Sequence, residues 1–201
     1  MKTLIIVDVQ NDFCPGGALA VNDGDAIVPI INALQSKFDL IVATQDWHPP
    51  RHKSFASSWN KSPGELIELG GAPQILWPDH CVQNTSGAEF HPQLETRNAK
   101  VFVKGTDENV DSYSGFFDNH HTHATGLGDF LKEHNADEVH VCGLATDYCV
   151  KFTALDAREL GFSTLLIEDA CRGVNLQLDD SQGAVEAMRA AGVRIVRSNE
   201  I

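Results

Sequence analysis

The sequence is short of basic residues. Its 201 residues include 15 lysines and arginines but 28 aspartates and glutamates, which gives a formal net charge of −13. A surface of this sign repels phosphate backbones and anionic lipids. Neither nucleic acid nor a membrane is therefore an expected partner. The composition leaves both a monomer and a homo-oligomer open.

Long apolar runs and paired cysteines are missing as well. No stretch approaches the roughly 20 apolar residues of a membrane-spanning helix, and the apolar N-terminus meets Asp8 too early for a signal peptide. The five cysteines are an odd number, scattered along the chain without a CxxC pair. Such cysteine usage is typical of a reduced protein, so we expect a cytoplasmic location.

The chain does contain enough apolar material for one core. Hydrophobic residues make up 42% of it and charged residues 21%, which is an ordinary composition for a globular protein of this length. No internal repeat and no linker divides the sequence. We therefore expect a single domain, 1–201.

Short apolar runs alternate with helical periodicity along this domain. Strands are expected at 3–7, 39–44, 100–103, 139–142, 163–168 and 193–196, and helices at 25–37, 128–135, from Thr146 or Asp147 onward, and 181–191. Uninterrupted apolar strands are typical of a parallel sheet that is covered on both faces. The pattern predicts a three-layer α/β/α, Rossmann-like fold, with a six-stranded, mostly parallel sheet and helices on both faces.

Residues 45–98 do not follow this alternation. The stretch is rich in Pro, Gly, Ser, His and Trp and is only weakly periodic. A segment of this length without clear elements is usually functional. We interpret it as an insertion that covers one end of the sheet.

Four reactive side chains, Asp8, Asp46, Lys104 and Cys149, fall at the carboxyl ends of predicted strands. Open α/β sheets form their sites at that edge. Cys149 lies in the first turn of a helix, where exposed N–H groups and the helix dipole favour the thiolate. Asp8 is then a candidate acceptor of the thiol proton, with Lys104 as a cation beside both. The alternative is that Cys149 is a buried packing residue.

A DxH pair offers a second kind of chemistry. Asp46 and His48 alternate on an extended segment and can therefore face one ion, and either His80 or His52 could complete the set. Two imidazoles and one carboxylate with open positions suit Zn²⁺, Fe²⁺ or Mn²⁺. A solvated loop, by contrast, is expected for the histidines of a polar stretch that has no strand to fix it: His120, His121 and His123.

Aromatic residues flank the reactive positions in sequence. They are Phe13, Trp77, Tyr113 and Tyr148. Together they could line a pocket for a flat ring, although ordinary packing explains each of them taken singly.

Five motifs together indicate a family. They are DVQNDF (8–13), QDWHPPRHKSF (45–55), WPDHCVQ (77–83), VKGTD with YSGF (103–116) and CGLATDYCV (142–150). Their combination resembles the bacterial nicotinamidases, which belong to the isochorismatase-like cysteine hydrolases. The resemblance runs from the first residue to about residue 170, without a departure at the matched positions.

This resemblance implies that the protein hydrolyses nicotinamide to nicotinate and ammonia in NAD salvage, through a thioester on Cys149, and that it accepts pyrazinamide as well. It implies a catalytic triad of Asp8, Lys104 and Cys149. It also implies a cis peptide bond between Leu144 and Ala145, which turns the Ala145 N–H toward the site. That N–H and the Cys149 N–H would form the oxyanion hole. The fold of the family agrees with the strand pattern above.

The same resemblance implies the metal ligands and the pocket. One divalent metal ion, with zinc favoured over iron or manganese, would bind to Asp46, His48 and His80 and hold the pyridine nitrogen. Ser54 would lie near the metal, whereas His52 would not be a ligand. The implied substrate-binding residues are Phe13, Trp77, Tyr113, Leu144 and Tyr148.

Three other functions fit parts of the sequence. The nearest is another amidase of the same superfamily, acting on a carbamoyl or ureido substrate. A metallohydrolase, in which the ion activates water and Cys149 is structural, would tolerate alkylation of its thiols. A catalytically silent ligand-binding protein would not need an intact triad.

Overall fold

Six strands form one parallel sheet. The computed structural model covers residues 1–201, and the strands are β1 (Lys2–Val7), β2 (Leu40–Asp46), β5 (Lys100–Lys104), β6 (Glu138–Leu144), β7 (Ser163–Arg172) and β8 (Arg194–Val196). Their order is β5-β2-β1-β6-β7-β8, and every neighbouring pair is parallel. The predicted sheet is therefore confirmed. Because β2 and β6 lie on opposite sides of β1, the strand order reverses beside β1, which is where such folds form their sites.

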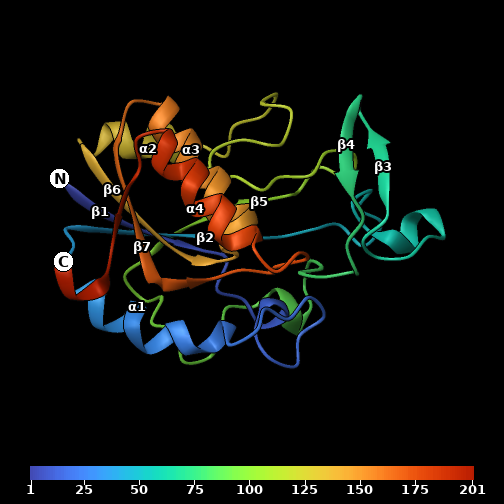
Figure 1. Cartoon of the computed structure of the whole chain (residues 1–201), viewed down its shortest axis with the longest axis horizontal. Helices are drawn as coiled ribbons and strands as arrows, with labels where there is room; N and C mark the ends of the chain where they lie inside the picture. The colour runs from blue at the N-terminus through green and yellow to red at the C-terminus, as the bar shows by residue number, and fades with distance from the viewer.

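Helices cover both faces of the sheet (Figure 1). On one face lies α1 (Val28–Gln35), and the other face carries α2 (Leu127–Glu133), α3 (Lys151–Glu159) and α4 (Asp180–Ala190). This is the expected three-layer arrangement. The first helix is shorter than the predicted 25–37 because it is preceded by a 3-10 turn, Gly24–Ile27. Pro29 lies in its first turn, where a missing N–H costs no hydrogen bond.

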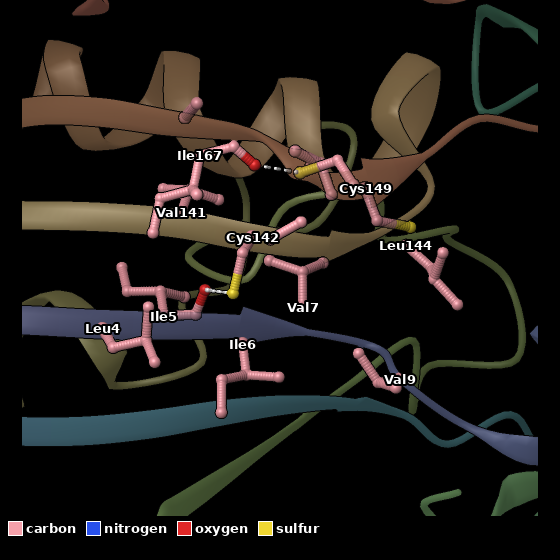
Figure 2. Close-up of a cluster of buried hydrophobic side chains, with 14 of the residues drawn as sticks. Leu4, Ile5, Ile6, Val7, Val9, Val141, Cys142, Leu144, Cys149 and Ile167 are labelled. Carbon is pink, nitrogen blue, oxygen red and sulfur yellow. Dashed lines mark hydrogen bonds between the residues drawn. The ribbon is translucent and has the colours of Figure 1, made fainter. Parts of the chain in front are cut away.

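The sheet is buried on both sides. All of residues 3–7 in β1 are buried, as an uninterrupted apolar strand predicts. The apolar ones belong to a cluster of 41 buried hydrophobic residues. Figure 2 shows part of this core between β1 and β6, where the Cys142 thiol donates to the Ile5 carbonyl at 3.7 Å. Cys142 is therefore a packing residue of the core.

β6 ends later than predicted, because the sequence pattern placed the end of this strand at residue 142, just before Gly143. It continues to Leu144, and β7 likewise extends beyond the predicted 168, to Arg172. Gly143 has a φ of 118°, and a Cβ there would collide with the Val7 carbonyl oxygen, so only glycine lets β6 stay beside β1. A π-helical turn, Thr146–Val150, then leads into α3. The helix thus begins where it was predicted, but with a wider first turn.

The range 45–98, which we interpret from the sequence as an insertion, begins within the end of β2 and contains regular structure that the sequence did not reveal. An antiparallel hairpin of β3 (Leu66–Leu69) and β4 (Ala72–Ile75) projects from the body of the molecule (Figure 1). Single 3-10 turns lie before and after it, at Ala56–Trp59 and Ser86–Ala88. None of the helices in the structure has the length and apolar character needed to cross a membrane.

Candidate active site

The reactive side chains converge at the carboxyl edge of the sheet. Lys104, the last residue of β5, lies at the centre. Its Nζ is 3.0 Å from Oδ2 of Asp8 and 2.9 Å from Oδ1 of Asp46. The same ammonium lies 3.5 Å from Sγ of Cys149 and donates to the Ser112 carbonyl at 2.7 Å. The convergence expected from the strand pattern is therefore present.

Lys104 compensates the negative charge of this cluster. Its side chain and that of Asp8 are completely buried. Burial alone would favour a neutral lysine, but Asp46 and Asp8 hold the pKa of Lys104 well above its usual value. Burial also opposes the charge of Asp46, yet His48 and Lys104 hold the pKa of that carboxyl well below its usual range. The ammonium and the Asp46 carboxylate therefore persist as a buried ion pair.

Asp8 turns out of the sheet into the site. It follows the last residue of β1 with a φ of 47°, in the left-handed region. Its Oδ1 accepts a hydrogen bond from the Thr44 hydroxyl at 2.6 Å, whereas Oδ2, although close to Lys104, accepts no aligned hydrogen bond. Burial raises the pKa of Asp8, and Lys104 opposes this rise. The raised pKa, together with the position of Asp8 beside the ammonium that also contacts Cys149, makes Asp8 the candidate base.

Cys149 lies in the π-helical turn that follows β6. Contrary to the expectation from its helix position, the thiolate is not favoured. Burial raises the pKa of Cys149 well above its usual value, an effect that Lys104 opposes but does not overcome. The dipole of one helical turn is a smaller effect than complete removal from water. The thiol therefore keeps its proton until a base takes it.

The peptide bond between Leu144 and Ala145 is cis, as the family resemblance implied. The Ala145 carbonyl accepts hydrogen bonds from the N–H groups of Tyr148 and Val150, which closes the π-helical turn. The Ala145 N–H donates no hydrogen bond inside the protein, and Ala145 lines the pocket next to Cys149. This N–H is therefore free to bind a substrate oxygen.

The three implied metal ligands face one another. Oδ2 of Asp46 lies 2.9 Å from Nε2 of His48 and 3.5 Å from Nε2 of His80. The other nitrogen of each ring, Nδ1, is paired with a backbone carbonyl, that of Gly105 at 2.9 Å for His48 and that of Pro78 at 2.8 Å for His80. Such pairing leaves the Nε2 lone pairs for a metal. The donor set therefore fits a divalent ion.

His52 lies beside this group but is oriented differently. Its ring centroid is 4.2 Å from that of His48. Its Nδ1 is 2.7 Å from the hydroxyl of Ser54. Burial and the neighbouring His48 lower the pKa of His52 to about 4. Together with His48 and Asp111 it forms a second group of possible ligands.

Asp118 organises the histidine-rich loop. Its carboxylate accepts hydrogen bonds from the backbone N–H groups of His120, Thr122 and His123. Burial works against its charge, but the hydrogen bonds from Thr122 and His123 lower the pKa of Asp118 to about 2. The side chains of His121 and His123 are 49% and 72% exposed. This part of the chain is a surface loop with a defined shape.

A pocket opens over Cys149. The residues that line it are Phe13, Leu19, Asp46, Trp77, His80, Asp111, Tyr113, Ala145, Tyr148, Cys149 and Val174. All four aromatic residues singled out in the sequence are among them. The rings of Trp77 and Tyr148 meet edge to face with centroids 4.8 Å apart, and the Trp77 indole donates to the Tyr113 hydroxyl at 3.2 Å. Aromatic side chains that contact one another thus form much of the wall.

The lining of this pocket differs from the sequence interpretation at four residues. Leu144 does not line it, because its side chain is fully buried and faces Gly24 in the core. Asp111 does line it, as a buried carboxylate that accepts hydrogen bonds from the Ser112 N–H and the Gln74 amide, both at 2.8 Å. Leu19 and Val174 were missed as well, because they are single apolar residues in loops and belong to no motif.

The isochorismatase domain family matches residues 2–200 of this sequence. The chain therefore belongs to the isochorismatase family. Within it, the nicotinamidase of Escherichia coli (strain K12) is 52% identical over 199 residues, which cover 96% of this chain and 93% of that protein.

Solved structures show the same likeness. That of the Acinetobacter baumanii nicotinamidase and pyrazinamidase has a TM-score of 0.96 at 49% identity, and the match covers 99% of this chain and 97% of the other. The pyrazinamidase of Pyrococcus horikoshii, solved in complex with zinc, has a TM-score of 0.80 at 40% identity, with 98% of each chain covered.

Proposed function

We propose that this protein is a nicotinamidase, which hydrolyses nicotinamide to nicotinate and ammonia and so returns the ring to NAD synthesis. The observation that carries this proposal is the buried Lys104 ammonium, which contacts the carboxylates of Asp8 and Asp46 and the thiol of Cys149. Cys149 and Asp46 also line a pocket with aromatic walls. A flat heteroaromatic amide fits such a pocket. The likeness to nicotinamidases over nearly the whole chain supports the same substrate.

The first half of the reaction forms a thioester. Asp8 takes the proton of the Cys149 thiol, and Sγ attacks the carboxamide carbon. The N–H groups of Ala145 and Cys149 bind the developing oxyanion, a role in which one donor contributes roughly 3 kcal/mol. Asp8 then gives its proton to the departing nitrogen, the C–N bond breaks, and ammonia leaves.

Water completes the reaction. Asp8, again a carboxylate, takes a proton from water, and the water oxygen attacks the thioester carbon. The C–S bond breaks, nicotinate leaves, and the proton returns to Cys149. Lys104 keeps its charge throughout, so it stabilises the anionic forms of Asp8 and Cys149 without exchanging a proton.

Asp46, His48 and His80 would hold a divalent metal ion. Their orientation, with both Nε2 atoms facing one carboxylate, suits Zn²⁺, and the zinc complex of the Pyrococcus horikoshii relative supports zinc over Fe²⁺ or Mn²⁺. A bound ion would supply a Lewis acid for the pyridine nitrogen. Phe13, Trp77 and the other pocket residues then fix the plane of the ring.

Ammonia release from nicotinamide tests this proposal. We expect the metal-replete protein to release ammonia and to lose this activity after treatment with iodoacetamide. Cys149→Ala is the necessary control, because four other cysteines are present. Release that survives alkylation would identify the metal as the catalyst and make Cys149 a packing residue. No release from nicotinamide would favour another small amide, such as a carbamoyl or ureido compound.

Pyrazinamide is proposed as a second substrate. It carries the same carboxamide, and its ring differs from that of nicotinamide by a nitrogen in place of one C–H group. The walls of the pocket are mainly apolar and aromatic, and such walls do not distinguish the two rings strongly. Comparing kcat/KM for the two amides tests this, and complete selectivity for nicotinamide would contradict it.

A further inference from the structure

The sheet contains a gap at the point where Asp8 enters the site. β1 pairs with β2 up to Val7 and Thr44. The last backbone bond between them, from the Asp8 N–H to the Thr44 carbonyl, is already long at 3.3 Å. Beyond it the backbone of β1 turns away in the left-handed region. The final residue of β2, Asp46, is therefore left without a neighbouring strand on this side.

The side chain of Gln10 fills that gap. Its Oε1 accepts a hydrogen bond from the Asp46 N–H at 2.8 Å, and its Nε2 donates to the Asp46 carbonyl at 2.8 Å. These are the acceptor and the donor that a neighbouring strand would supply. The second hydrogen of Nε2 goes to the Ala88 carbonyl, also at 2.8 Å, and Gln10 is completely buried. Three hydrogen bonds thus fix the amide in one orientation.

Asp46 connects the two halves of the site. Its Oδ1 pairs with Lys104 at 2.9 Å, and its Oδ2 lies between the Nε2 atoms of His48 and His80. A shift of its backbone would move both oxygens together. We infer that Gln10 is a positioning residue, which fixes the backbone of Asp46 and so aims its carboxylate at the metal and at Lys104. This inference rests on the proposed role of Asp46 as a metal ligand.

The chemistry of the side chain explains why an amide is needed. Only an amide offers a donor and an acceptor side by side in the geometry of a peptide group. A carboxylate at this position would accept from the Asp46 N–H but repel the Asp46 and Ala88 carbonyls. An apolar side chain would leave the buried N–H and C=O of Asp46 unpaired, and they would rearrange to find other partners.

Gln10→Met tests the inference, with Gln45→Met as its matched control. Gln45 also donates to the Ala88 carbonyl at 2.8 Å but makes no hydrogen bond to the backbone of Asp46. The affinity for Zn²⁺ is measured by competition with a chromogenic chelator, beside thermal unfolding and the kcat and KM for nicotinamide. We expect Gln10→Met to bind zinc about 10- to 100-fold more weakly, the usual loss when a partner of a metal ligand is removed. Gln45→Met should leave the affinity unchanged.

Wild-type zinc affinity in folded Gln10→Met, or an equal loss in Gln45→Met, would overturn the role of Gln10. Should Gln10→Met not fold, Gln10→Asn carries the same test, because it keeps the amide but withdraws it by one methylene. The zinc titration needs no substrate. The wild-type protein could bind zinc through Asp46 and yet release no ammonia from nicotinamide. That result would contradict only the proposed substrate. The role of Gln10 would still be supported if Gln10→Met binds zinc more weakly than the wild type.

Discussion

Each end of the sheet holds a buried histidine next to a carboxylate, yet only one end forms a site. Near the amino end, in β6, Nε2 of His140 lies 2.7 Å from Oε1 of Glu138. At the carboxyl end of β2, Nε2 of His48 lies 2.9 Å from Oδ2 of Asp46. The side chains of His140 and His48 are only 2% and 1% exposed, so neither the burial of the histidine nor the presence of a carboxylate partner separates the two ends.

Their surroundings do separate them. Nδ1 of His140 has no hydrogen-bond partner, its ring packs edge-on against Phe38, and Glu138 is partly open to solvent. Nδ1 of His48 is held by a carbonyl, and Asp46 is shared with a second histidine and with Lys104. A single strand contributes only its own alternate residues, whereas the carboxyl ends of several strands deliver groups to one point. Chemistry in this fold follows from convergence of strand ends rather than from a pair.

Removing the thiol at the carboxyl end should have the largest effect. Cys149→Ala is expected to lower kcat by at least about 10⁴-fold, because the nucleophile is lost, while metal content stays unchanged. Cys142→Ala, which alters a buried thiol within β6, should retain its turnover. Ammonia release and metal analysis on both variants check this, and substantial turnover by Cys149→Ala would rule out the thioester.

Removing the central cation should have the next largest effect. Lys104→Met leaves Asp8 and Asp46 buried without their counter-ion, which should reduce the free energy of unfolding by about 3–5 kcal/mol and abolish turnover. The partly exposed pair near the amino end should matter far less, so Glu138→Gln is expected to cost no more than about 1 kcal/mol. Urea unfolding at pH 7 measures both. Equal losses would mean that burial does not distinguish the two pairs.

Removing one histidine at each end tests the metal assignment. His48→Ala should lose the metal and raise KM for nicotinamide, because the ring nitrogen loses its anchor. His140→Gln should keep both the metal content and KM. Metal analysis of the purified variants after dialysis against Zn²⁺ measures this directly, and an unchanged metal content in His48→Ala would remove His48 from the site.

The smallest expected effect is a pH dependence near the amino end. Burial lowers the pKa of His140, and the hydrogen bond to Glu138 opposes this shift without reversing it, while Lys2 and Arg194 act with burial. The folded protein binds this proton less readily than the unfolded chain does. The neutral His140 therefore makes its whole contribution to the free energy of unfolding above the unfolded pKa of about 6.5. That contribution is lost as the pH falls from there toward the pKa of His140 in the folded protein. Between pH 7 and 5 the wild type should therefore lose more thermal stability than His140→Gln. A parallel loss in both proteins would assign the effect to other groups.

Local patterns were sufficient to predict the six-stranded sheet but not the β3–β4 hairpin. The strand at 3–7 is buried on both faces, so its apolar run is unbroken and ends visibly at Asp8. β3 and β4 have only four residues each, and Gln74 is the one buried residue among them, so neither strand has a long apolar run to recognise. The extension of β6 through Gly143 was not predicted, because it depends on the close approach of the β1 backbone at Val7, which no local sequence pattern reveals.

Within the site, residue type and strand position were sufficient for Asp8, Asp46, Lys104 and Cys149. The raised pKa of Cys149 was not foreseen, because it comes from burial by distant segments and not from its own helix. The role of Gln10 was not foreseen either, since its partner Asp46 is 36 residues away and shares no local pattern with it. Contacts of this kind exist only once the strands are aligned.

Lys104 belongs to β5, which is an edge strand with a single neighbour. Two of its side chains, Val101 and Val103, are 36% and 46% exposed. Edge strands with little cover open locally at a lower free energy than central strands do. We expect such an opening to withdraw the ammonium from between Asp8 and Asp46 while the rest of the molecule stays folded. Amide exchange along β5 therefore reports the fraction of molecules that are competent for turnover, which global unfolding does not.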